Sequence, residues 1–160
     1  MQLRQVRPEE AEVIWQIRNQ AIRHGCKGVY EDQVIAAWTP DKMPESQRTM
    51  ITNNPFYVAT TVDDKPVATG FLDLANASVE AIFTLPEWEG KGLATQIIEA
   101  IKQEATKRGL VRITLASTPN ACTFYQKQGF VILRESLYPS ALARAELRCI
   151  EMEYNFPVDK

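Results

Sequence analysis

The order of hydrophobic patterns along the chain constrains its fold more than any other feature. Three consecutive runs rich in β-branched and aromatic residues, separated by short polar turns, predict an antiparallel meander of three strands. These runs are residues 56–62, 67–74 and 79–85. The next segment, 92–108, predicts an amphipathic helix, because apolar side chains recur there at every fourth position. These side chains are Leu93, Ile97, Ile101 and Ala105.

The residues before the meander predict one strand and several helices. A short strand at 2–7 precedes a helix over 8–25, since Pro8 suits the first helical turn and two carboxylates follow it. Residues 30–54 predict a less regular helical region, with a break near Thr39 and a further turn or two from residue 45.

The residues after the central helix complete the pattern and set the fold class. They predict a strand, a short helix, a second strand, a loop with some helical character and a closing strand. These elements are 111–116, 120–128, 130–133, 137–145 and 147–154. The whole order predicts an α+β protein rather than a doubly wound sheet. A length of 160 residues favours a single domain over 1–160.

Charge and cysteine usage exclude several functional classes. Eighteen basic and 20 acidic residues give a formal net charge of −2, so no overall positive field attracts nucleic acid or an anionic membrane. No run approaches the ~20 apolar residues that span a bilayer, and we expect a cytoplasmic protein. Three cysteines without a CxxC pair, with a single histidine, predict reduced thiols and no metal site.

A glycine-containing turn at 86–94 joins the last meander strand to the central helix. Gly90 and Gly92 let main-chain N–H groups turn toward one point, and the helix start adds free donors and a partial positive charge. We therefore expect an anion site here, although an ordinary strand-to-helix turn is the alternative. A P-loop is disfavoured because neither Ser nor Thr follows Lys91, and a dinucleotide motif would need a third glycine at Thr95.

A second candidate segment, 120–130, begins just after the strand at 111–116. If that strand runs parallel to the strand at 79–85, the starts of both following helices open on the same edge of the sheet. Asn120 and Tyr125 then face the same cleft as the anion site. The alternative is that Asn120 caps its helix and that Tyr125 is a half-buried aromatic residue whose hydroxyl is satisfied.

Taken together, the turn at 86–94, the helix after it and the pattern Asn-Ala-x2-Phe-Tyr-x3-Gly-Phe over 120–130 resemble the GCN5-related N-acetyltransferase (GNAT) superfamily. The resemblance covers about residues 6–154. It implies a mixed, mostly antiparallel central sheet of about six or seven strands with helices on both faces. It also implies a transferase that binds acetyl-CoA and moves the acetyl group directly to a primary amine in a ternary complex, without a metal.

The resemblance implies cofactor-binding roles for individual residues. The turn that presents main-chain amides to the CoA pyrophosphate maps onto Glu89, Gly90, Lys91, Gly92, Leu93 and Ala94, with Thr95 next in the cofactor-binding set. Glu89 departs from the Gln or Arg usual at this position and places a carboxylate near the diphosphate. The residues implied to contact the pantetheine arm are Phe83 and Leu85, through main-chain groups, and Asn120, near the thiol end.

Tyr125 is implied as the general acid that protonates the departing CoA thiolate. A phenol with a pKa near ~10 remains protonated at neutral pH and can donate to a thiolate of pKa near ~8.5. Attack of an amine on a thioester needs a neutral amine and a protonated leaving group, and neither requires a metal or an enzyme nucleophile. The side-chain chemistry of the sequence agrees with the resemblance.

Three further residues are candidates for catalytic roles. Glu80 alternates with Ile82 and Thr84 on one face of its strand and can serve as the general base, with a solvated edge carboxylate as the alternative. His24 lies near the end of the first helix, where acceptor pockets of the superfamily often lie, but a lone histidine is more often structural. Cys122 begins a helix without an assigned base, which favours a small buried residue over a nucleophile.

The acceptor stays open at the level of a small-molecule or peptide amine, because segments 23–54 and 138–144 set specificity in this superfamily. Four aromatic residues are candidates for a wall around the acceptor or for the core. They are Tyr30, Trp38, Phe56 and Trp88. The alternative function is a non-catalytic acyl-CoA-binding or regulatory module of the same fold, motivated by Glu89. Relatives are often dimers, so a homodimer is an open possibility, and no nucleic-acid or membrane partner is expected.

Overall fold

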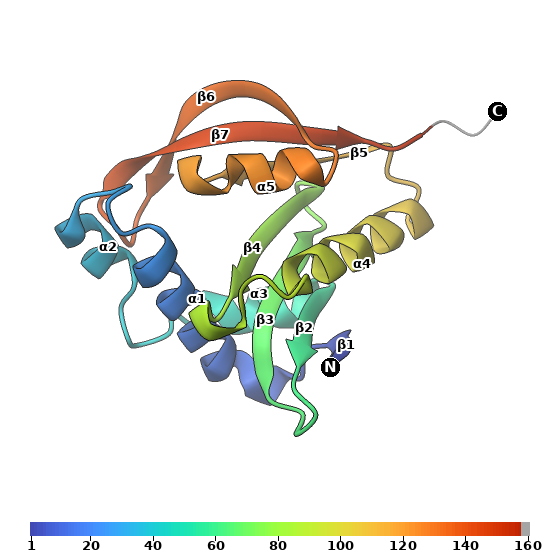
Figure 1. Ribbon diagram of the computed structural model, residues 1–160, viewed down its shortest axis with the longest axis horizontal. Helices are drawn as coiled ribbons and strands as arrows, with labels where there is room; N and C mark the ends of the chain where they lie inside the picture. Colours follow the sequence, from blue (N-terminus) through green and yellow to red (C-terminus); the bar gives the residue numbers. More distant parts are fainter. Residues whose placement is uncertain (158–160) are drawn as a thin grey trace.

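The computed structural model describes residues 1–157 and contains a seven-stranded sheet in the order β1-β2-β3-β4-β5-β7-β6 (Figure 1). The strands are β1 (Gln2–Gln5), β2 (Phe56–Thr60), β3 (Pro66–Asp73), β4 (Ser78–Thr84), β5 (Arg112–Ser117), β6 (Val131–Ser140) and β7 (Ala145–Asn155). Neighbouring strands are antiparallel except for β4 and β5, which run parallel. This mixed sheet confirms the predicted α+β class and the meander of β2, β3 and β4.

Five α-helices and three short 3-10 helices connect the strands of the described residues. The α-helices are α1 (Ala11–Gly25), α2 (Asp32–Trp38), α3 (Ser46–Asn53), α4 (Leu93–Lys107) and α5 (Cys122–Lys127). The 3-10 helices are η1 (Pro8–Glu10), η2 (Pro86–Trp88) and η3 (Pro119–Ala121). Within residues 1–157, no helix combines the length and the apolarity that a membrane span requires.

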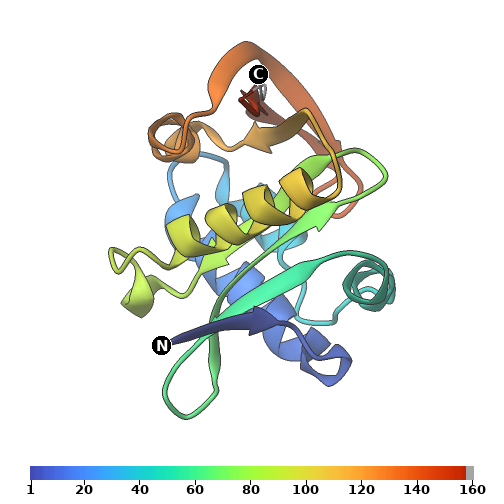
Figure 2. The same cartoon turned by 90° about the vertical axis from the view of Figure 1, so that its right-hand side faces the viewer.

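Helices cover both faces of the sheet, as the resemblance implies. Figure 2 shows α4 crossing in front of the strands and α1 lying behind them. Alternate residues of β2 point to opposite faces of the sheet and belong to two separate hydrophobic cores. Tyr57 and Ala59 pack with the apolar face of α4, whereas Phe56 and Val58 pack with the apolar face of α1. The central strands are therefore buried on both faces.

The apolar stripe predicted from the sequence holds α4 against the sheet. Leu93, Ile97, Ile98, Ile101 and Ala105 are buried. The helix ends where Leu110 N–H donates to Ala105 O at 3.0 Å and Gly109 takes a φ of 76°, an arrangement that glycine favours. Because this packing fixes the whole helix, the start of α4 is held close to the end of β4.

The segment after α5 differs from the loop predicted from the sequence. Residues 137–145 were expected to form a loop after a short strand at 130–133, but β6 continues to Ser140 and pairs with β7 along its length. Only a four-residue turn, 141–144, separates the two strands. Because β6 lies at the edge of the sheet and exposes most of its side chains, it lacks the apolar alternation that marks a strand. An edge position also tolerates Pro139.

β4 and β5 separate soon after they begin to pair. Ser78 and Thr114 form the paired position of this parallel ladder. Ala81, whose φ is 55°, lies in a bulge that shifts the register of β4 against β3. The expected strict alternation along β4 is therefore wrong, because Ile82 packs on the α4 side of the sheet, as Val79 does. Gly70 makes room for this arrangement, since a Cβ there would lie 2.3 Å from Cδ1 of Ile82.

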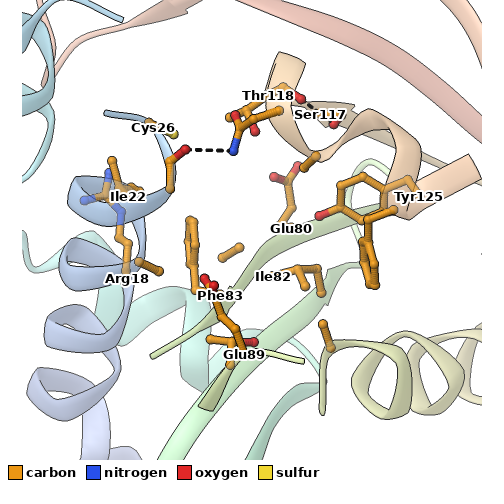
Figure 3. Close-up of a pocket in the computed structure, with 18 of the residues that line it drawn as sticks. Arg18, Ile22, Cys26, Glu80, Ile82, Phe83, Glu89, Ser117, Thr118 and Tyr125 are labelled. Atoms are coloured by element: carbon orange, nitrogen blue, oxygen red, sulfur yellow. Dashed lines mark hydrogen bonds between the residues drawn. The ribbon is translucent and has the colours of Figure 1, made fainter. Parts of the chain in front are cut away.

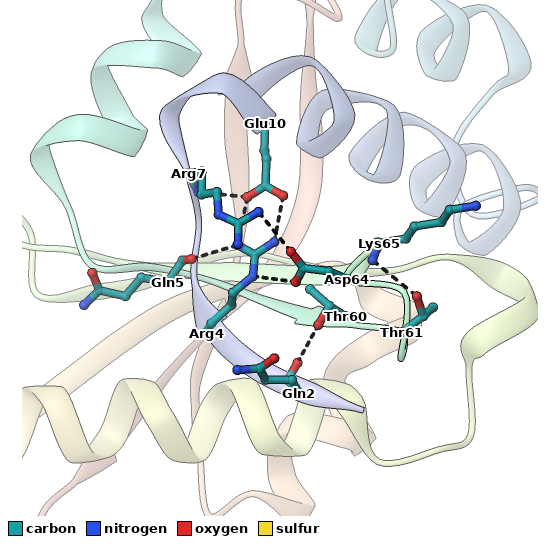
Figure 4. A network of polar contacts seen from close by, with 9 residues as sticks. All are labelled: Gln2, Arg4, Gln5, Arg7, Glu10, Thr60, Thr61, Asp64 and Lys65. Atoms are coloured by element: carbon teal, nitrogen blue, oxygen red, sulfur yellow. Dashed lines mark hydrogen bonds and ion pairs between the residues drawn. The ribbon is translucent and has the colours of Figure 1, made fainter.

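A network of charged groups ties β1 to η1 and to the β2–β3 turn (Figure 4). Arg4 Nη2 lies 2.8 Å from Oε2 of Glu10, and Arg4 Nε lies 3.0 Å from Oδ1 of Asp64. Arg7 Nη1 lies 2.9 Å from Oδ2 of Asp64. The hydrogen bond from Arg4 is the main reason that the pKa of Glu10 lies below its ordinary value. These ion pairs hold β1 against η1 and the β2–β3 turn.

Candidate active site

A cleft of about 820 Å³ opens where β4 leaves β5 (Figure 3). Its walls come from α1, α2, β4, the turn before α4, the end of β5, η3 with α5, and the β6–β7 hairpin. Its volume lies within the roughly 300–1,000 Å³ of typical small-molecule sites. The turn at 86–94 and the segment 120–130 both line the cleft, as expected from the parallel pairing of β4 and β5.

The turn before α4 presents main-chain donors to this cleft. Gly90 and Gly92 take φ values of 77° and 78°, in the left-handed region where other residues are strained. Gly92 is the N-cap of α4, and no side chain caps this helix. The first N–H groups of α4 therefore keep their hydrogen-bonding capacity, and the helix dipole adds a partial positive charge beside the cleft. This arrangement suits an anionic ligand.

Side chains of the turn take different positions around the cleft. Glu89, Gly90, Gly92, Leu93, Ala94 and Thr95 line it. The side chain of Lys91 lies instead over the Trp88 ring, with Nζ 5.9 Å from the ring centroid. The Glu89 side chain is exposed at the cleft, beside the main-chain N–H groups of the turn. Thr95 Oγ1 accepts a hydrogen bond of 3.1 Å from Gln128 Nε2, which joins the start of α4 to the end of α5.

The main chain of β4 offers an open edge toward β5. Leu85 N–H donates to Val67 O at 2.9 Å and so belongs to the ladder with β3. Because N–H groups alternate along a strand, the main-chain groups of Phe83 also face β3, and those of Ile82 and Thr84 face the gap. Leu85 does not line the cleft, whereas Ile82, Phe83 and Thr84 do. The contacts predicted for Phe83 and Leu85 with a pantetheine arm stay a prediction, and Ile82 and Thr84 are further candidates at this open edge.

Tyr125 and Glu80 face each other in the cleft. Figure 3 shows the Tyr125 hydroxyl pointing from α5 toward the Glu80 carboxylate on β4. Burial raises the pKa of the Tyr125 phenol above its ordinary value, and the Glu80 charge raises this pKa further. Burial likewise raises the pKa of Glu80, against the opposing hydrogen bond from Ser78. The cleft thus holds a protonated phenol beside a partly desolvated carboxylate.

Asn120 forms a bridge across the mouth of the cleft. Its Nδ2 donates to Gly25 O at 3.0 Å, which joins η3 to the end of α1. Asn120 is not a helix cap, because η3 begins after Thr118 and no side chain caps η3 or α5. The alternative role that the sequence left open for this residue is therefore wrong. Asn120 lines the same cleft as Tyr125.

The far side of the cleft includes four residues to which the sequence assigns no role in the site. They are Arg18 and Ile22 of α1, and Leu147 and Cys149 of β7. Cys26 and Tyr138 of β6 complete this side and lie in the segments 23–54 and 138–144 expected to set acceptor specificity. A signal for Arg18 does exist in the sequence. It stands four residues from both Ile14 and Ile22, so a charged residue interrupts the apolar row of α1.

Aromatic residues line part of this far side. Tyr30 and Trp38 meet edge to face with ring centroids 5.8 Å apart, and both line the cleft, as Trp88 does. Tyr30 OH donates to Arg148 O at 2.7 Å, and burial raises the pKa of Tyr30 to about 12. Phe56 lies elsewhere, stacked on Phe71 in the core with centroids 4.6 Å apart.

Two further candidates lie outside the catalytic geometry. His24 is exposed and does not line the cleft. Cys122 is a buried free thiol that packs in the core with α4, in agreement with the structural alternative for this residue. In the described part of the chain, no three His, Cys, Asp or Glu side chains are grouped as metal ligands require.

Comparisons with known proteins agree with the family resemblance and the fold. The acetyltransferase (GNAT) domain family matches residues 26–155. The peptidyl-lysine N-acetyltransferase YjaB of Salmonella typhimurium is 28% identical over 137 residues, which cover 84% of this chain and 86% of that protein.

Two solved structures extend the likeness to almost the whole chain. A GCN5-related N-acetyltransferase from Rhodopseudomonas palustris superposes with a TM-score of 0.86 at 22% identity, covering 97% of this chain and 95% of its own. The PaiA N-acetyltransferase of Thermoplasma acidophilum, solved in complex with coenzyme A, gives 0.79 at 18% identity and covers 97% and 98%. From the family match and this shared fold, the chain belongs to the GCN5-related N-acetyltransferase family and is an acetyltransferase of that type.

Proposed function

We propose that this protein transfers an acetyl group from acetyl-CoA directly to a primary amine within a ternary complex. One observation carries the proposal. A single cleft brings together the free donors at the start of α4, the open edge of β4, and the facing side chains of Glu80 and Tyr125. Each of the three suits one part of the reaction.

The first two features fit a CoA thioester. The main-chain N–H groups at Gly92, Leu93 and Ala94 would hold the diphosphate, since left-handed glycines and a helix start favour an anion. The open edge at Ile82 and Thr84 would pair with the amide groups of the pantetheine arm in the manner of an added strand. The Thermoplasma protein, which has the same fold, was solved in complex with coenzyme A, and this supports a CoA thioester as the ligand. Acetyl-CoA supplies the thioester that acts as acyl donor.

Glu80 and Tyr125 move the two protons that the reaction requires. Glu80 accepts the proton of the attacking amine, and its raised pKa makes it a stronger base than an ordinary carboxylate. The amine nitrogen forms a bond to the acetyl carbon while the bond from that carbon to sulfur breaks. Tyr125 then donates its proton to the departing thiolate, because the raised pKa of the phenol keeps it protonated. All atoms and charges balance without a metal.

A second candidate function is a non-catalytic acyl-CoA-binding or regulatory module. The specific observation behind it is Glu89, an exposed carboxylate beside the donors that would hold the diphosphate. The negative charges of the Glu89 carboxylate and of a diphosphate repel each other, which weakens CoA binding. A regulatory protein tolerates a weakly bound ligand better than an enzyme does. We place this candidate second because Glu80 and Tyr125 already provide a base and an acid at the same site.

The release of free thiol from acetyl-CoA tests the proposal and separates the two candidates. The purified chain is incubated with acetyl-CoA and a broad panel of primary amines, and calorimetry measures acetyl-CoA binding in parallel. We expect binding together with steady thiol release for at least one amine. Binding without thiol release for any amine supports the regulatory module, and absence of binding overturns both candidates.

A further inference from the structure

We propose that the acceptor is an amino acid or a similar small zwitterion, and that Arg18 binds its carboxylate. The inference rests on the proposed function, because it names the class of the second substrate in the same cleft. The amine of this acceptor would lie near Glu80 on β4, and its carboxylate near Arg18 on α1.

Arg18 is held rigidly on the wall of the cleft. Its guanidinium carbon lies 4.2 Å from the centroid of the Trp15 ring and 5.7 Å from that of Trp38. Nη1 donates to Oδ1 of Asn19 at 2.8 Å and to Trp38 O at 2.9 Å. Asn19 is itself 3% exposed and fixed, since its Nδ2 donates to Pro40 O at 2.9 Å. The guanidinium is thus oriented before any ligand arrives.

Part of this guanidinium has no acceptor within residues 1–157. Nη1 makes both hydrogen bonds that the structure shows for the side chain, which leaves Nε and Nη2. No buried side-chain nitrogen or oxygen in the described residues lacks a partner, so these two nitrogens are accessible from the solvent. Arg18 lines the cleft, and Figure 3 shows its side chain rising along the wall formed by α1. Two adjacent free donors match the two oxygens of a carboxylate.

The charge of Arg18 also lacks a counterion among residues 1–157. Three arginines in the described chain are half-buried: Arg4, Arg18 and Arg48. Arg4 pairs with Glu10 and Asp64, and Arg48 pairs with Glu12, whereas no carboxylate of residues 1–157 pairs with Arg18. Burial lowers the pKa of Arg18 to about 10, so the group is charged at neutral pH but poorly solvated. A partly desolvated cation without a partner favours an anionic ligand.

The opposite charge on β4 completes the recognition of a zwitterion. Glu80 suits an ammonium group near the thioester, and Arg18 suits an anion on another wall of the same cleft. Tyr30, Trp38 and Tyr138 line the cleft as well, so an apolar or aromatic side chain of the acceptor would find ring surfaces to contact. A purely cationic acceptor, such as a diamine, would instead place a second positive charge near Arg18.

Matched acceptors test the inference with the unchanged protein. For each of the 20 common amino acids, thiol release is compared with that of its carboxamide and its decarboxylated amine. We expect kcat/KM for the best amino acid to exceed both analogues by about tenfold to a hundredfold, the value of a charge-assisted hydrogen bond. Calorimetry on the complex with coenzyme A compares the binding of the same ligands, so the comparison does not depend on turnover.

Variants assign the effect to Arg18. Arg18→Met is expected to lower kcat/KM for the amino acid about tenfold or more and to change that for the decarboxylated amine less than about threefold. Arg18→Lys should restore part of the loss, since it keeps the charge without the planar fork. Arg48→Met is the matched control, because Arg48 is also half-buried but lies outside the cleft, and it should leave the discrimination unchanged.

The outcomes separate this inference from the proposed function. Equal or better turnover and binding of the neutral or decarboxylated analogues by the unchanged protein overturns the zwitterion class and leaves amine acetylation intact. A preference for carboxylates that survives in Arg18→Met overturns the role of Arg18, provided that the variant still melts cooperatively and binds coenzyme A. Absence of acetyl-CoA binding by the unchanged protein overturns the proposed function itself.

Discussion

Ser78 Oγ donates a hydrogen bond of 2.9 Å to Oε1 of Glu80, two residues along the same strand. Ser78 is also the residue at which β4 pairs with β5, where the cleft begins. The same residue therefore positions the carboxylate of the proposed base. The hydrogen bond stabilises the charged carboxylate, whereas burial destabilises it. Glu80 therefore titrates under two opposing influences.

Removing this hydrogen bond should shift the acid limb of the pH–rate profile. Ser78→Ala removes the influence that lowers the pKa of Glu80, so this pKa should rise further. The acid limb of kcat/KM for a confirmed acceptor then moves to higher pH, because the base loses its charge earlier as the pH falls. Ser46→Ala, on exposed α3, is the control. An unshifted limb would show that the titration of Glu80 does not govern the rate.

Neutralising the base should affect turnover more than binding. Glu80→Gln keeps the shape of the side chain but cannot accept the amine proton, so kcat should fall about 10²- to 10⁴-fold. Calorimetry should find an unchanged affinity for acetyl-CoA, since Glu80 lies away from the turn before α4. If Glu80→Gln kept the full kcat, Glu80 would not be the general base, and its role would be that of a solvated edge carboxylate.

A side chain at Gly92 should weaken CoA binding. Gly92→Val places a β-branched residue at a φ of 78°, which costs about 1–2 kcal/mol and displaces the start of α4. We expect calorimetry to show that the affinity for acetyl-CoA falls about tenfold or more. Gly28→Val is a matched control, because Gly28 has a φ of 83° and lies outside the cleft. Equal loss of affinity in both variants would attribute the effect to general instability.

The charge network at the amino terminus should stabilise the fold in a pH-dependent way. Because the folded-state pKa of Glu10 is lowered, its stabilisation is present above the ordinary pKa and is lost as the pH falls through the lowered value. Glu10→Gln should cost about 1–3 kcal/mol of unfolding free energy near neutral pH. Urea unfolding should show this difference shrinking as the pH falls below the ordinary range of a carboxyl pKa. Glu9→Gln, at an exposed neighbour, is the control, and a pH-independent difference would contradict the account.

Strong periodicity explains which parts of the fold were predictable. The meander of β2, β3 and β4 and the apolar stripe of α4 carry patterns that burial imposes directly on the sequence. The parallel pairing of β4 and β5 follows because α4 is a crossover connection. These elements position the turn before α4 and Tyr125, so the two segments that the sequence proposes for the site line the same cleft.

The remaining features depend on contacts that no single segment encodes. The edge strand β6 exposes most of its side chains, and the bulge at Ala81 uses a left-handed residue that is not glycine. The place of Ile82 and Thr84 at the open edge follows from this local register. The proposed role of Arg18 cannot be predicted from the sequence, because it depends on the absence of a carboxylate partner among the described residues, which only the folded structure reveals.

The proposed role of Tyr125 is the central chemical claim, and Tyr125→Phe tests it most directly. The variant keeps the ring that meets Phe124 and Phe130 edge to face and removes only the hydroxyl. Tyr154→Phe, a tyrosine outside the cleft, serves as the control.

The deciding measurement is the rate of thiol release from acetyl-CoA by Tyr125→Phe with a confirmed amine acceptor, beside calorimetric binding of acetyl-CoA. The account predicts that kcat falls about 10²-fold or more while the affinity for acetyl-CoA is retained. An unchanged kcat in a variant that binds acetyl-CoA normally would contradict it.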